Sequence, residues 1–248
     1  RHHAIFRTSV QSMPVCDNGA IVEVQDALGA FLSYATINNR SYLCARSFAF
    51  TKDEPLGTLR RLIKRSIELR ARMPSLQDTD AIRLINAEGD SIPGLIVDQY
   101  GEFLIVQLTT VGMDKLKVFI FDLLMELRKP KGIYEKSTGS ARKKEALGDR
   151  EGWVRGKGDD VLTVTERGIK FLISLSGSQK TGLFLDQREM RSLVREFSAG
   201  QTVLDVCSYV GGFALAALSG GALAADCVDY DAEAIETALT SGCNLIDS

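Results

Sequence analysis

Short apolar runs separated by turn residues occupy the first part of the chain. Asp17-Asn-Gly19 and Asn38-Asn39 lie between three runs that we interpret as strands, at 20–24, 31–35 and 44–50. Short strands punctuated in this way are typical of a small β-barrel. A helical spacing of apolar residues follows and predicts a helix from about 56 to 73, which Pro74 ends.

The pattern changes twice further along the chain. Residues 79–176 are predicted to hold three strands, a helix, a strand, a basic loop and a hairpin, at 82–85, 95–97, 103–108, 112–128, 132–136, 140–158 and 161–173. From about 177, strands and helices alternate, at 203–206, 212–218, 224–228 and 231–240. Such alternation predicts parallel βαβ units. Because two strands cannot cover both faces of a parallel sheet, we expect this α/β region to be only part of a domain.

Composition narrows the class of protein. The chain has 45% hydrophobic and 25% charged residues, and no apolar run approaches the roughly 18–20 residues that span a bilayer. The five cysteines are scattered, odd in number and include no C-x-x-C pair. We therefore expect reduced thiols in a cytoplasmic protein, with no membrane segment and no metal site.

Charge is distributed unevenly along the chain. Residues 199–248 contain seven acids and no lysine or arginine, whereas residues 58–72 carry six basic residues against one acid. Residues 128–157 carry ten basic residues against four acids. Phosphate binding needs clustered lysine and arginine, so a polyanion is expected to bind the first two thirds of the chain.

The most informative segment is a strand, a glycine turn and a helix, Val203-Leu-Asp-Val-Cys-Ser-Tyr-Val-Gly-Gly-Phe213. An open α/β sheet presents a cofactor in this way at its carboxyl edge. The turn lacks the early glycines of a dinucleotide fingerprint, which favours S-adenosylmethionine, a cofactor with no phosphate to hold. Asp205 ends this strand, where it could accept a hydrogen bond from the amino group of the cofactor. Asp229 ends the next strand, where an acid receives both ribose hydroxyls. The alternative is an ordinary αβ turn in which Asp229 caps the following helix.

Several motifs together resemble one enzyme family. Lys180-Thr-Gly-Leu-Phe-Leu-Asp-Gln-Arg-Glu-Met-Arg191 resembles the K-T-G-x-F-L-D-Q-R-x-x-R signature of the RlmI-like large-subunit rRNA cytosine-C5 methyltransferases. Residues 203–213, 86–101 and 133–137 are similar to further segments of that family. The resemblance covers nearly the whole chain.

The resemblance implies a multi-domain fold class. It implies a β-barrel PUA-like RNA-binding domain at 1–74 with its first strand missing, and an α+β central domain at 79–176. Residues 177–248 would form the N-terminal part of a Rossmann-like methyltransferase domain. The family's catalytic Asn/Asp-Pro-Pro motif lies further downstream, so we assign no catalytic residue and expect this segment alone to be inactive. Cys207 is interpreted as a packing residue rather than a nucleophile.

The cofactor-binding residues follow from the same resemblance. They are Lys180, Phe184, Gln187, Arg188, Asp205, Ser208, Tyr209, Gly211, Gly212, Asp229 and Tyr230. Two alternatives stay open. Lys180 and Arg188 could instead form surface ion pairs or contact RNA, and Tyr209 and Tyr230 could be plain packing residues.

The expected partner is large-subunit ribosomal RNA, and a homodimer is a further possibility. The candidate RNA-binding residues are Arg60, Arg61, Lys64, Arg65, Arg142, Lys143, Lys144, Arg155 and Lys157. Those at 142–144 are preferred because loops can follow a phosphate backbone. The alternative for the basic helix at 60–65 is an ordinary solvated face.

We therefore expect a methyltransferase that acts on C5 of a cytosine in large-subunit rRNA. Two rivals remain. The same scaffold could modify another RNA base or a small molecule, since a fold does not determine a function. Alternatively, the chain could be a non-catalytic RNA-binding protein.

Overall fold

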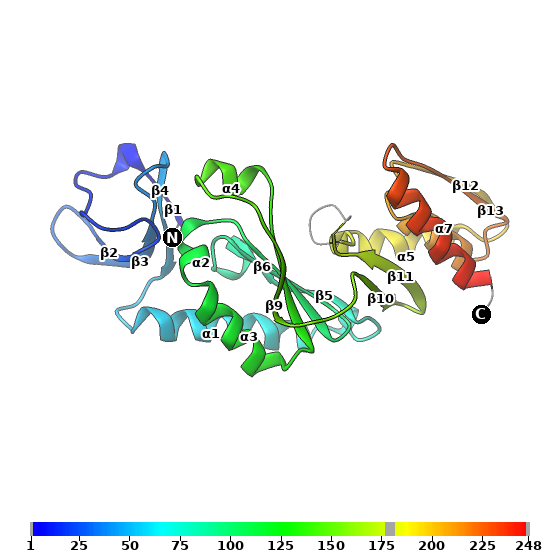
Figure 1. The fold of residues 1–248 in the computed structure, drawn as a ribbon, viewed down its shortest axis with the longest axis horizontal. Helices are drawn as coiled ribbons and strands as arrows, with labels where there is room; N and C mark the ends of the chain where they lie inside the picture. Colours follow the sequence, from blue (N-terminus) through cyan, green and yellow to red (C-terminus); the bar gives the residue numbers. More distant parts are fainter. Residues whose placement is uncertain (1, 177–181, 247–248) are drawn as a thin grey trace. The chain divides into compact units, whose positions relative to one another are not determined.

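The computed structural model describes residues 2–176 and 182–246, with side chains placed as far as Gly242. Two compact units can be distinguished (Figure 1). The first comprises the residues up to Met73 together with Arg83–Gly158, and the second comprises Pro74–Ile82 together with the residues from Asp159 onward. Each unit is described by itself.

The N-terminal strands form an open sheet. Its four strands run in the order β1-β4-β3-β2, and every neighbouring pair is antiparallel. They are β1 (Ala4–Phe6), β2 (Ile21–Gln25), β3 (Phe31–Ile37) and β4 (Leu43–Ala49). A short 3-10 helix, η1 (Arg7–Ser9), follows β1. In the described residues β1 and β2 are edge strands that do not pair with each other, so the sheet does not close.

The expected separate β-barrel domain is therefore wrong. Besides leaving its edges unpaired, the N-terminal sheet belongs to the same compact unit as the next sheet. A buried acid connects them: Glu145 lies 2.6 Å from the guanidinium of Arg46 on β4 and accepts a hydrogen bond from Asn38 at 2.9 Å. Because a buried carboxylate is stable only when it is paired, this network fixes the two sheets in one unit.

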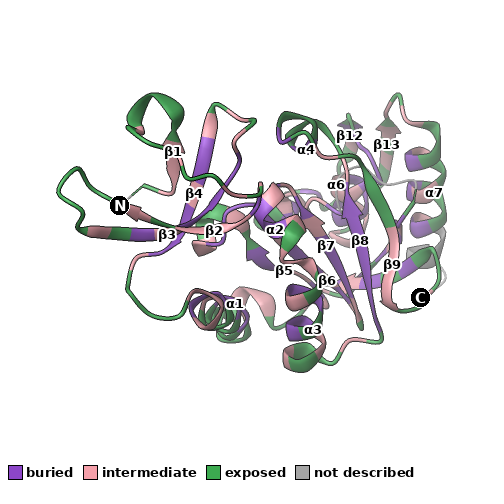
Figure 2. Cartoon of the chain, turned by 60° about the vertical axis from the view of Figure 1, so that its left-hand side comes forward, coloured by how far each residue is buried: buried purple, intermediate pink, exposed green. Residues whose placement is uncertain are grey.

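A five-stranded sheet forms the rest of the first unit. Its order is β5-β6-β7-β8-β9, with β7 and β8 parallel and the pairs β6/β7 and β8/β9 antiparallel. The strands are β5 (Ala81–Asn86), β6 (Leu95–Tyr100), β7 (Phe103–Leu108), β8 (Gly132–Ser137) and β9 (Arg150–Gly156). The short 3-10 helices η2 (Pro74–Leu76) and η3 (Ala87–Asp90) flank β5. All six residues of β8 are buried, as expected for an inner strand (Figure 2).

Two long helices lie side by side along this sheet (Figures 1 and 2). They are α1 (Pro55–Ala71) and α3 (Lys117–Arg128), joined by a two-pronged ion pair between Arg60 and Glu126. The apolar residues that predicted α1 are buried at Leu59, Ile63 and Ile67, which confirms that helix. The expected helix at 112–128 is interrupted at Leu116, so a short α2 (Val111–Lys115) precedes α3.

The segment at 140–158 is not the basic loop that was expected. It contains a short helix, α4 (Ser140–Lys144), and the edge strand β9. The reason is Arg142, which is fully buried and donates to the carbonyls of Leu108 and Gly148 and to Asp114. These contacts tie the segment to the sheet instead of leaving it in solvent.

The second unit carries the glycine turn. A hairpin of β10 (Val161–Glu166) and β11 (Ile169–Ser174) is followed by the short η4 (Leu185–Gln187) and by α5 (Arg188–Phe197). The remaining elements are β12 (Thr202–Val206), α6 (Gly212–Ser219), β13 (Ala224–Val228) and α7 (Ala232–Ile246). Strands β12 and β13 are parallel, which confirms the predicted βαβ alternation.

One face of this two-stranded sheet packs on α6, whose Ala214, Leu215, Ala216 and Ala217 are buried. The other face leaves Leu204, Val206 and Val228 more than half exposed. No helix among the described residues is both long and apolar enough to cross a membrane. Within the same residues, no group of three or more His, Cys, Asp or Glu side chains is arranged to hold a metal ion.

Candidate cofactor site and nucleic-acid surface

The carboxyl ends of β12 and β13 bring Asp205 and Asp229 to the same edge. Because the two strands are parallel and pair in register, Asp205 lies opposite Cys227, two residues before Asp229. Asp205 is buried, and its Oδ2 accepts a hydrogen bond from the backbone nitrogen of Ala214 at 3.1 Å. Burial raises the pKa of the Asp205 carboxyl, and the hydrogen bonds from the start of α6 oppose that rise only in part.

Asp229 has a different environment. Its Oδ1 accepts from the backbone nitrogen of Asp231 at 3.0 Å, and its Oδ2 accepts from that of Tyr209 at 2.8 Å. These two hydrogen bonds lower the pKa of the Asp229 carboxyl, so it is ionised at neutral pH. The helix cap of α7 is instead Asp231, whose Oδ1 accepts from Ala234 at 3.1 Å. Asp229 therefore organises the turn rather than capping the helix.

The turn between β12 and α6 has an unusual backbone. Cys207, Tyr209 and Gly211 all have positive φ, at 59°, 50° and 70°. Non-glycine residues rarely adopt this region, and where they do so together the site is commonly functional. The backbone nitrogens of Cys207 and Ser208 donate to the carbonyl of Val228, at 2.8 and 3.2 Å, which fixes the turn to β13.

The glycines of the turn have local reasons to be there. A Cβ at Gly211 would lie 2.9 Å from the Cβ of Ala238, so only glycine allows α7 to pack here. A Cβ at Gly212 would lie 3.4 Å from the Cδ of Arg191, so the arginine stem lies against the first residue of α6. Cys207, which we expected to be a packing residue, is exposed, because its left-handed backbone turns away from the sheet.

The aromatic candidates take different positions. The ring of Tyr209 is buried and packs edge-on against that of Phe184, with centroids 5.4 Å apart and planes at 81°. Tyr230 is 90% exposed at the end of β13. Phe184 thus comes to the glycine turn from the segment that precedes α5.

The remaining signature residues lie around that segment. The backbone nitrogen of Gln187 donates to the carbonyl of Phe184 at 3.1 Å, and its side chain is partly exposed. Arg188 is buried and donates to Glu166 at 2.8 Å and to the carbonyl of Ala81. Its guanidinium is therefore occupied by protein groups. Lys180 lies outside the described residues.

Two buried residues near this segment were not among the site residues expected from the sequence. Glu166 and Arg191 are both buried, and Arg191 donates to both carboxylate oxygens of Glu166 and to the carbonyl of Phe184. The spacing of Arg188 and Arg191, three residues apart, places them on one face of a helix. Two arginines on one helix face are compatible with one shared acidic partner. The sequence could not show that this partner is Glu166, because Glu166 lies on a different element, β10.

The residues at the edge fit S-adenosylmethionine. The Oγ of Ser208 is buried and makes no hydrogen bond to a nitrogen or oxygen of the described residues, and its side chain contacts the thiol of Cys227. The turn and both strands contain no lysine or arginine. A pyrophosphate placed beside Asp205 and Asp229 would therefore meet uncompensated negative charge, whereas a phosphate-free nucleoside with a cationic sulfonium would not.

The candidate RNA-binding residues divide by their partners. On α1, Arg60 pairs with Glu126, Arg61 with Asp53 at 2.7 Å, and Lys64 with Glu68 at 3.8 Å, while Arg65 is exposed. Their charge is therefore largely balanced locally.

The second basic region behaves differently. Lys143 and Lys144 on α4 are exposed, and so is Lys157. Arg155 is paired with Asp122 at 2.7 Å, and the buried Arg142 is a structural residue rather than a surface contact.

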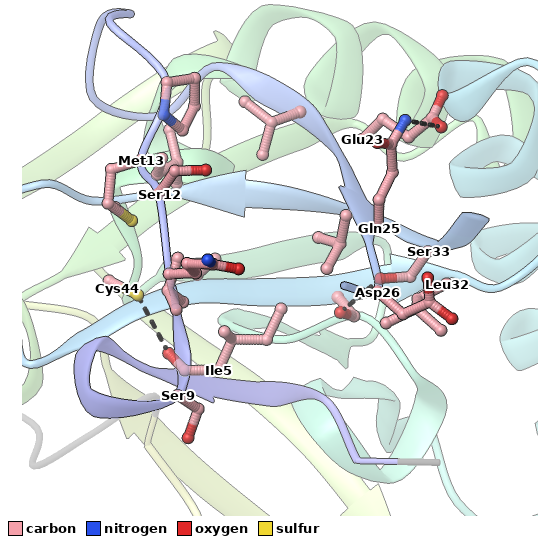
Figure 3. Close-up of a pocket in the computed structure, with 18 of the residues that line it drawn as sticks. Ile5, Ser9, Ser12, Met13, Glu23, Gln25, Asp26, Leu32, Ser33 and Cys44 are labelled. Carbon is pink, nitrogen blue, oxygen red and sulfur yellow. Dashed lines mark hydrogen bonds between the residues drawn. The ribbon is translucent and has the colours of Figure 1, made fainter. Parts of the chain in front are cut away.

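A hollow of about 1150 Å³ lies in the first unit (Figure 3). Ser12 and Met13 lie on the same side of it as Cys44 of β4, and Glu23, Gln25 and Ser33 of β2 and β3 lie on the other. Its acids are Glu23 and Asp26, and neither lysine nor arginine lines it. Its charge does not suit a phosphate backbone.

Comparison with known proteins defines the class of this chain. Residues 143–239 match the family described as S-adenosylmethionine-dependent methyltransferase. Within that class, the chain is similar to the large-subunit ribosomal RNA methyltransferases that our motif analysis indicated, and the similarity supports that resemblance.

Two curated relatives show this similarity, and both are named "Ribosomal RNA large subunit methyltransferase I". The relative from Klebsiella pneumoniae is 33% identical over 96% of this chain and 60% of its own length. The relative from Aeromonas salmonicida is 34% identical over 96% of this chain and 61% of its own length. The chain thus spans about three fifths of the relatives that it matches.

Solved structures show the same fold. A methyltransferase-like structure from Streptococcus mutans is 25% identical, with a TM-score of 0.78 over 96% of this chain and 62% of its own. Another, solved with SAH, is 24% identical, with a TM-score of 0.81 over 97% of this chain and 61% of its own. The similarity covers nearly the whole chain and so includes the N-terminal sheet. That sheet is thus part of the methyltransferase fold, which again contradicts the multi-domain class with a separate PUA barrel.

Proposed function

We propose that this chain binds S-adenosylmethionine at the carboxyl edge of β12 and β13. The observation that carries the proposal is the pair of acids at consecutive strand ends, joined by a turn with three left-handed residues. The proposed contacts are Phe184, Gln187, Asp205, Ser208, Tyr209, Gly211, Gly212, Asp229 and Tyr230. Lys180 stays a prediction, and Arg188 is left out because its donors are used within the protein.

Asp229 is the central residue of this site. Each carboxylate oxygen has two acceptor positions, and the backbone of Tyr209 and Asp231 occupies one on each. The backbone of Tyr230 adds a third hydrogen bond to this carboxylate, and the acceptor capacity that remains is proposed to receive the ribose hydroxyls. The exposed Tyr230 adjoins Asp229 and offers its ring to the adenine. Because the carboxylate is already oriented by the backbone, little reorganisation is needed when the nucleoside binds.

We further propose that the methyl acceptor is large-subunit ribosomal RNA, and within it C5 of a cytosine. The names of the curated relatives support the RNA, and the signature at 180–191 supports the base. When bound, the cofactor supplies a methyl group on a sulfonium. The residues of this chain hold and orient it, which is the main task when the leaving group is already good. We assign no nucleophile or base to a described residue.

The RNA is proposed to contact the first unit. Lys143, Lys144 and Lys157 are exposed cations, and Arg65 adds to them on α1. Arg60, Arg61, Lys64 and Arg155 form ion pairs that would have to open, so they are secondary candidates. We place the activity in the cytoplasm, which the free thiols of Cys16, Cys44, Cys207 and Cys227 support.

The deciding experiment is calorimetric titration of the protein with S-adenosylhomocysteine and, as a matched dinucleotide, NAD. We expect saturable binding of the first and none of the second. Binding of NAD alone would contradict the proposed cofactor. Binding of RNA without either ligand would favour the non-catalytic alternative.

A further inference from the structure

Glu166 is a buried acid at the end of β10 that holds two arginines of α5. Its Oε2 accepts from Nε of Arg188 at 2.8 Å, and its Oε1 accepts from Nε of Arg191 at 2.8 Å. A second donor of Arg191 lies 2.9 Å from Oε2. The three side chains are at most 6% exposed. One carboxylate is therefore the shared counter-charge of two buried cations, and either arginine would lose that partner without it.

The electrostatic state of Glu166 agrees with that arrangement. Burial by itself would raise the pKa of this carboxyl, but the hydrogen bonds and charges of Arg191 and Arg188 outweigh burial and lower it. Glu166 is therefore ionised when the protein is folded at neutral pH. The guanidinium of Arg191 also lies over the ring of Phe171, 5.8 Å from its centroid, which adds a cation–π contact from β11.

The two arginines differ in their remaining contacts. Arg188 donates to the carbonyl of Ala81, away from the turn. Arg191 donates to the carbonyl of Phe184 at 2.9 Å, and its stem lies against Gly212 at the start of α6. Arg191 thus touches both segments that meet at the proposed cofactor edge. Phe184 continues the contact, because its ring packs on that of Tyr209.

We propose that Glu166 is a positioning residue of the cofactor site, acting through Arg191 on Phe184 and Tyr209. Glu166 does not touch the cofactor. It fixes the guanidinium that holds the carbonyl of Phe184, and so it sets the place of the ring on which the buried Tyr209 rests. Functional groups need such support from surrounding hydrogen bonds to keep a productive geometry. The choice of S-adenosylmethionine as the ligand rests on the proposed function. The link from Glu166 through Arg191 to Phe184 does not depend on it.

A matched pair of substitutions separates positioning from plain stability. Arg191→Lys and Arg188→Lys each keep the positive charge beside Glu166. Each also loses the several fixed N–H donors of one guanidinium group. Only Arg191→Lys breaks the link to Phe184. If Glu166 merely neutralised buried charge, the two variants would behave alike. Glu166→Gln keeps the shape of the side chain and removes its charge, so it should act in the same direction as Arg191→Lys.

Two measurements on each variant test the proposal. The first is the affinity for S-adenosylhomocysteine by calorimetry, which should fall at least about tenfold in Arg191→Lys and Glu166→Gln, and less than about threefold in Arg188→Lys. The second is hydrogen exchange of the unliganded protein. Exchange should accelerate in residues 182–187 and 207–211 of the first two variants, and to a smaller extent or not at all in Arg188→Lys.

The outcomes are distinguishable. Equal effects of Arg191→Lys and Arg188→Lys in both measurements would overturn the positioning role. If the unmodified protein bound no S-adenosylhomocysteine, the proposed function would fail, and the exchange comparison would still decide whether Glu166 and Arg191 position the Phe184 segment. Should Glu166→Gln fail to fold, the two lysine variants carry the test by themselves.

Discussion

The backbone nitrogen of Tyr209 donates a hydrogen bond of 2.8 Å to Oδ2 of Asp229. This bond joins the turn after β12 to the end of β13 and holds Tyr209 in its left-handed conformation, with φ at 50°. The other oxygen, Oδ1, accepts from the backbone nitrogen of Asp231 at 3.0 Å, so the backbone orients both oxygens at the strand edge. One residue pair therefore shapes the turn and presents the acid to a ligand.

The first prediction concerns that acid. Asp229→Ala should weaken the binding of S-adenosylhomocysteine by about tenfold or more, because the ribose hydroxyls would lose their acceptors and the turn its anchor. Calorimetry measures this directly. The control is Asp226→Asn, which removes an exposed acid from the same strand and should leave the affinity unchanged. Equal affinities of Asp229→Ala and the unmodified protein would remove Asp229 from the site.

A second prediction tests the RNA surface. Replacing Lys143 and Lys144 with alanine should weaken binding to a large-subunit rRNA fragment. The slope of log affinity against log salt should become shallower by up to about two units, since each lost phosphate contact contributes about 0.7–0.9. The double variant Lys52→Ala/Lys170→Ala removes the same charge elsewhere and serves as the control. Identical slopes for the two double variants would show that α4 does not contact phosphate.

The third prediction separates Arg142 from its neighbours. Arg142→Ala should lower the free energy of unfolding by about 3–5 kcal/mol, because the carbonyls of Leu108 and Gly148 lose their buried donor and Asp114 keeps only Arg150, 3.7 Å away. Lys143→Ala, one residue later on the surface, should change it by less than about 0.5 kcal/mol. Urea unfolding followed by circular dichroism compares them. A mild effect of Arg142→Ala would show that its burial contributes little.

Glu166 gives a prediction about pH. Its pKa is lowered in the folded protein relative to 4.5, so the unfolded state binds more protons in the acidic range. The stability that Glu166 contributes is therefore fully present above about pH 4.5 and is lost as the pH falls through the lowered folded pKa. Thermal unfolding across this range should show a difference between the unmodified protein and Glu166→Gln that shrinks as the pH falls. A difference that stays constant would mean that the ionised carboxylate is not the source of the stability.

The last prediction concerns the open face of β12 and β13. Leu204 and Val206 are 64% and 62% exposed on neighbouring positions of that face. Contiguous apolar surface of this kind favours association, so this 248-residue protein should self-associate with rising concentration in light scattering. The double variant Leu204→Lys/Val206→Lys should be less associated. If both proteins stayed monomeric over the same range, this face would not drive association.

The local part of the fold and of the site could be predicted from the sequence. The alternation from 203 onward indicated parallel β12 and β13, and this alone placed Asp205 and Asp229 at one edge, because the carboxyl ends of parallel strands coincide. The glycines also marked the turn, although Gly211 turned out to serve the packing of α7. Such features depend on neighbours in sequence and on periodicity.

Only the tertiary structure decided the environment of the charged residues. Arg142 and Arg188 were candidates for solvent or ligand, but each is buried against an acid 28 or 22 residues away, Asp114 and Glu166. It also decided that the first four strands form an open sheet within the first unit. A long cationic side chain can reach solvent or a distant carboxylate equally well, and strand periodicity is the same in a sheet and in a barrel. The choice in both cases is made by long-range partners, which local sequence patterns do not identify.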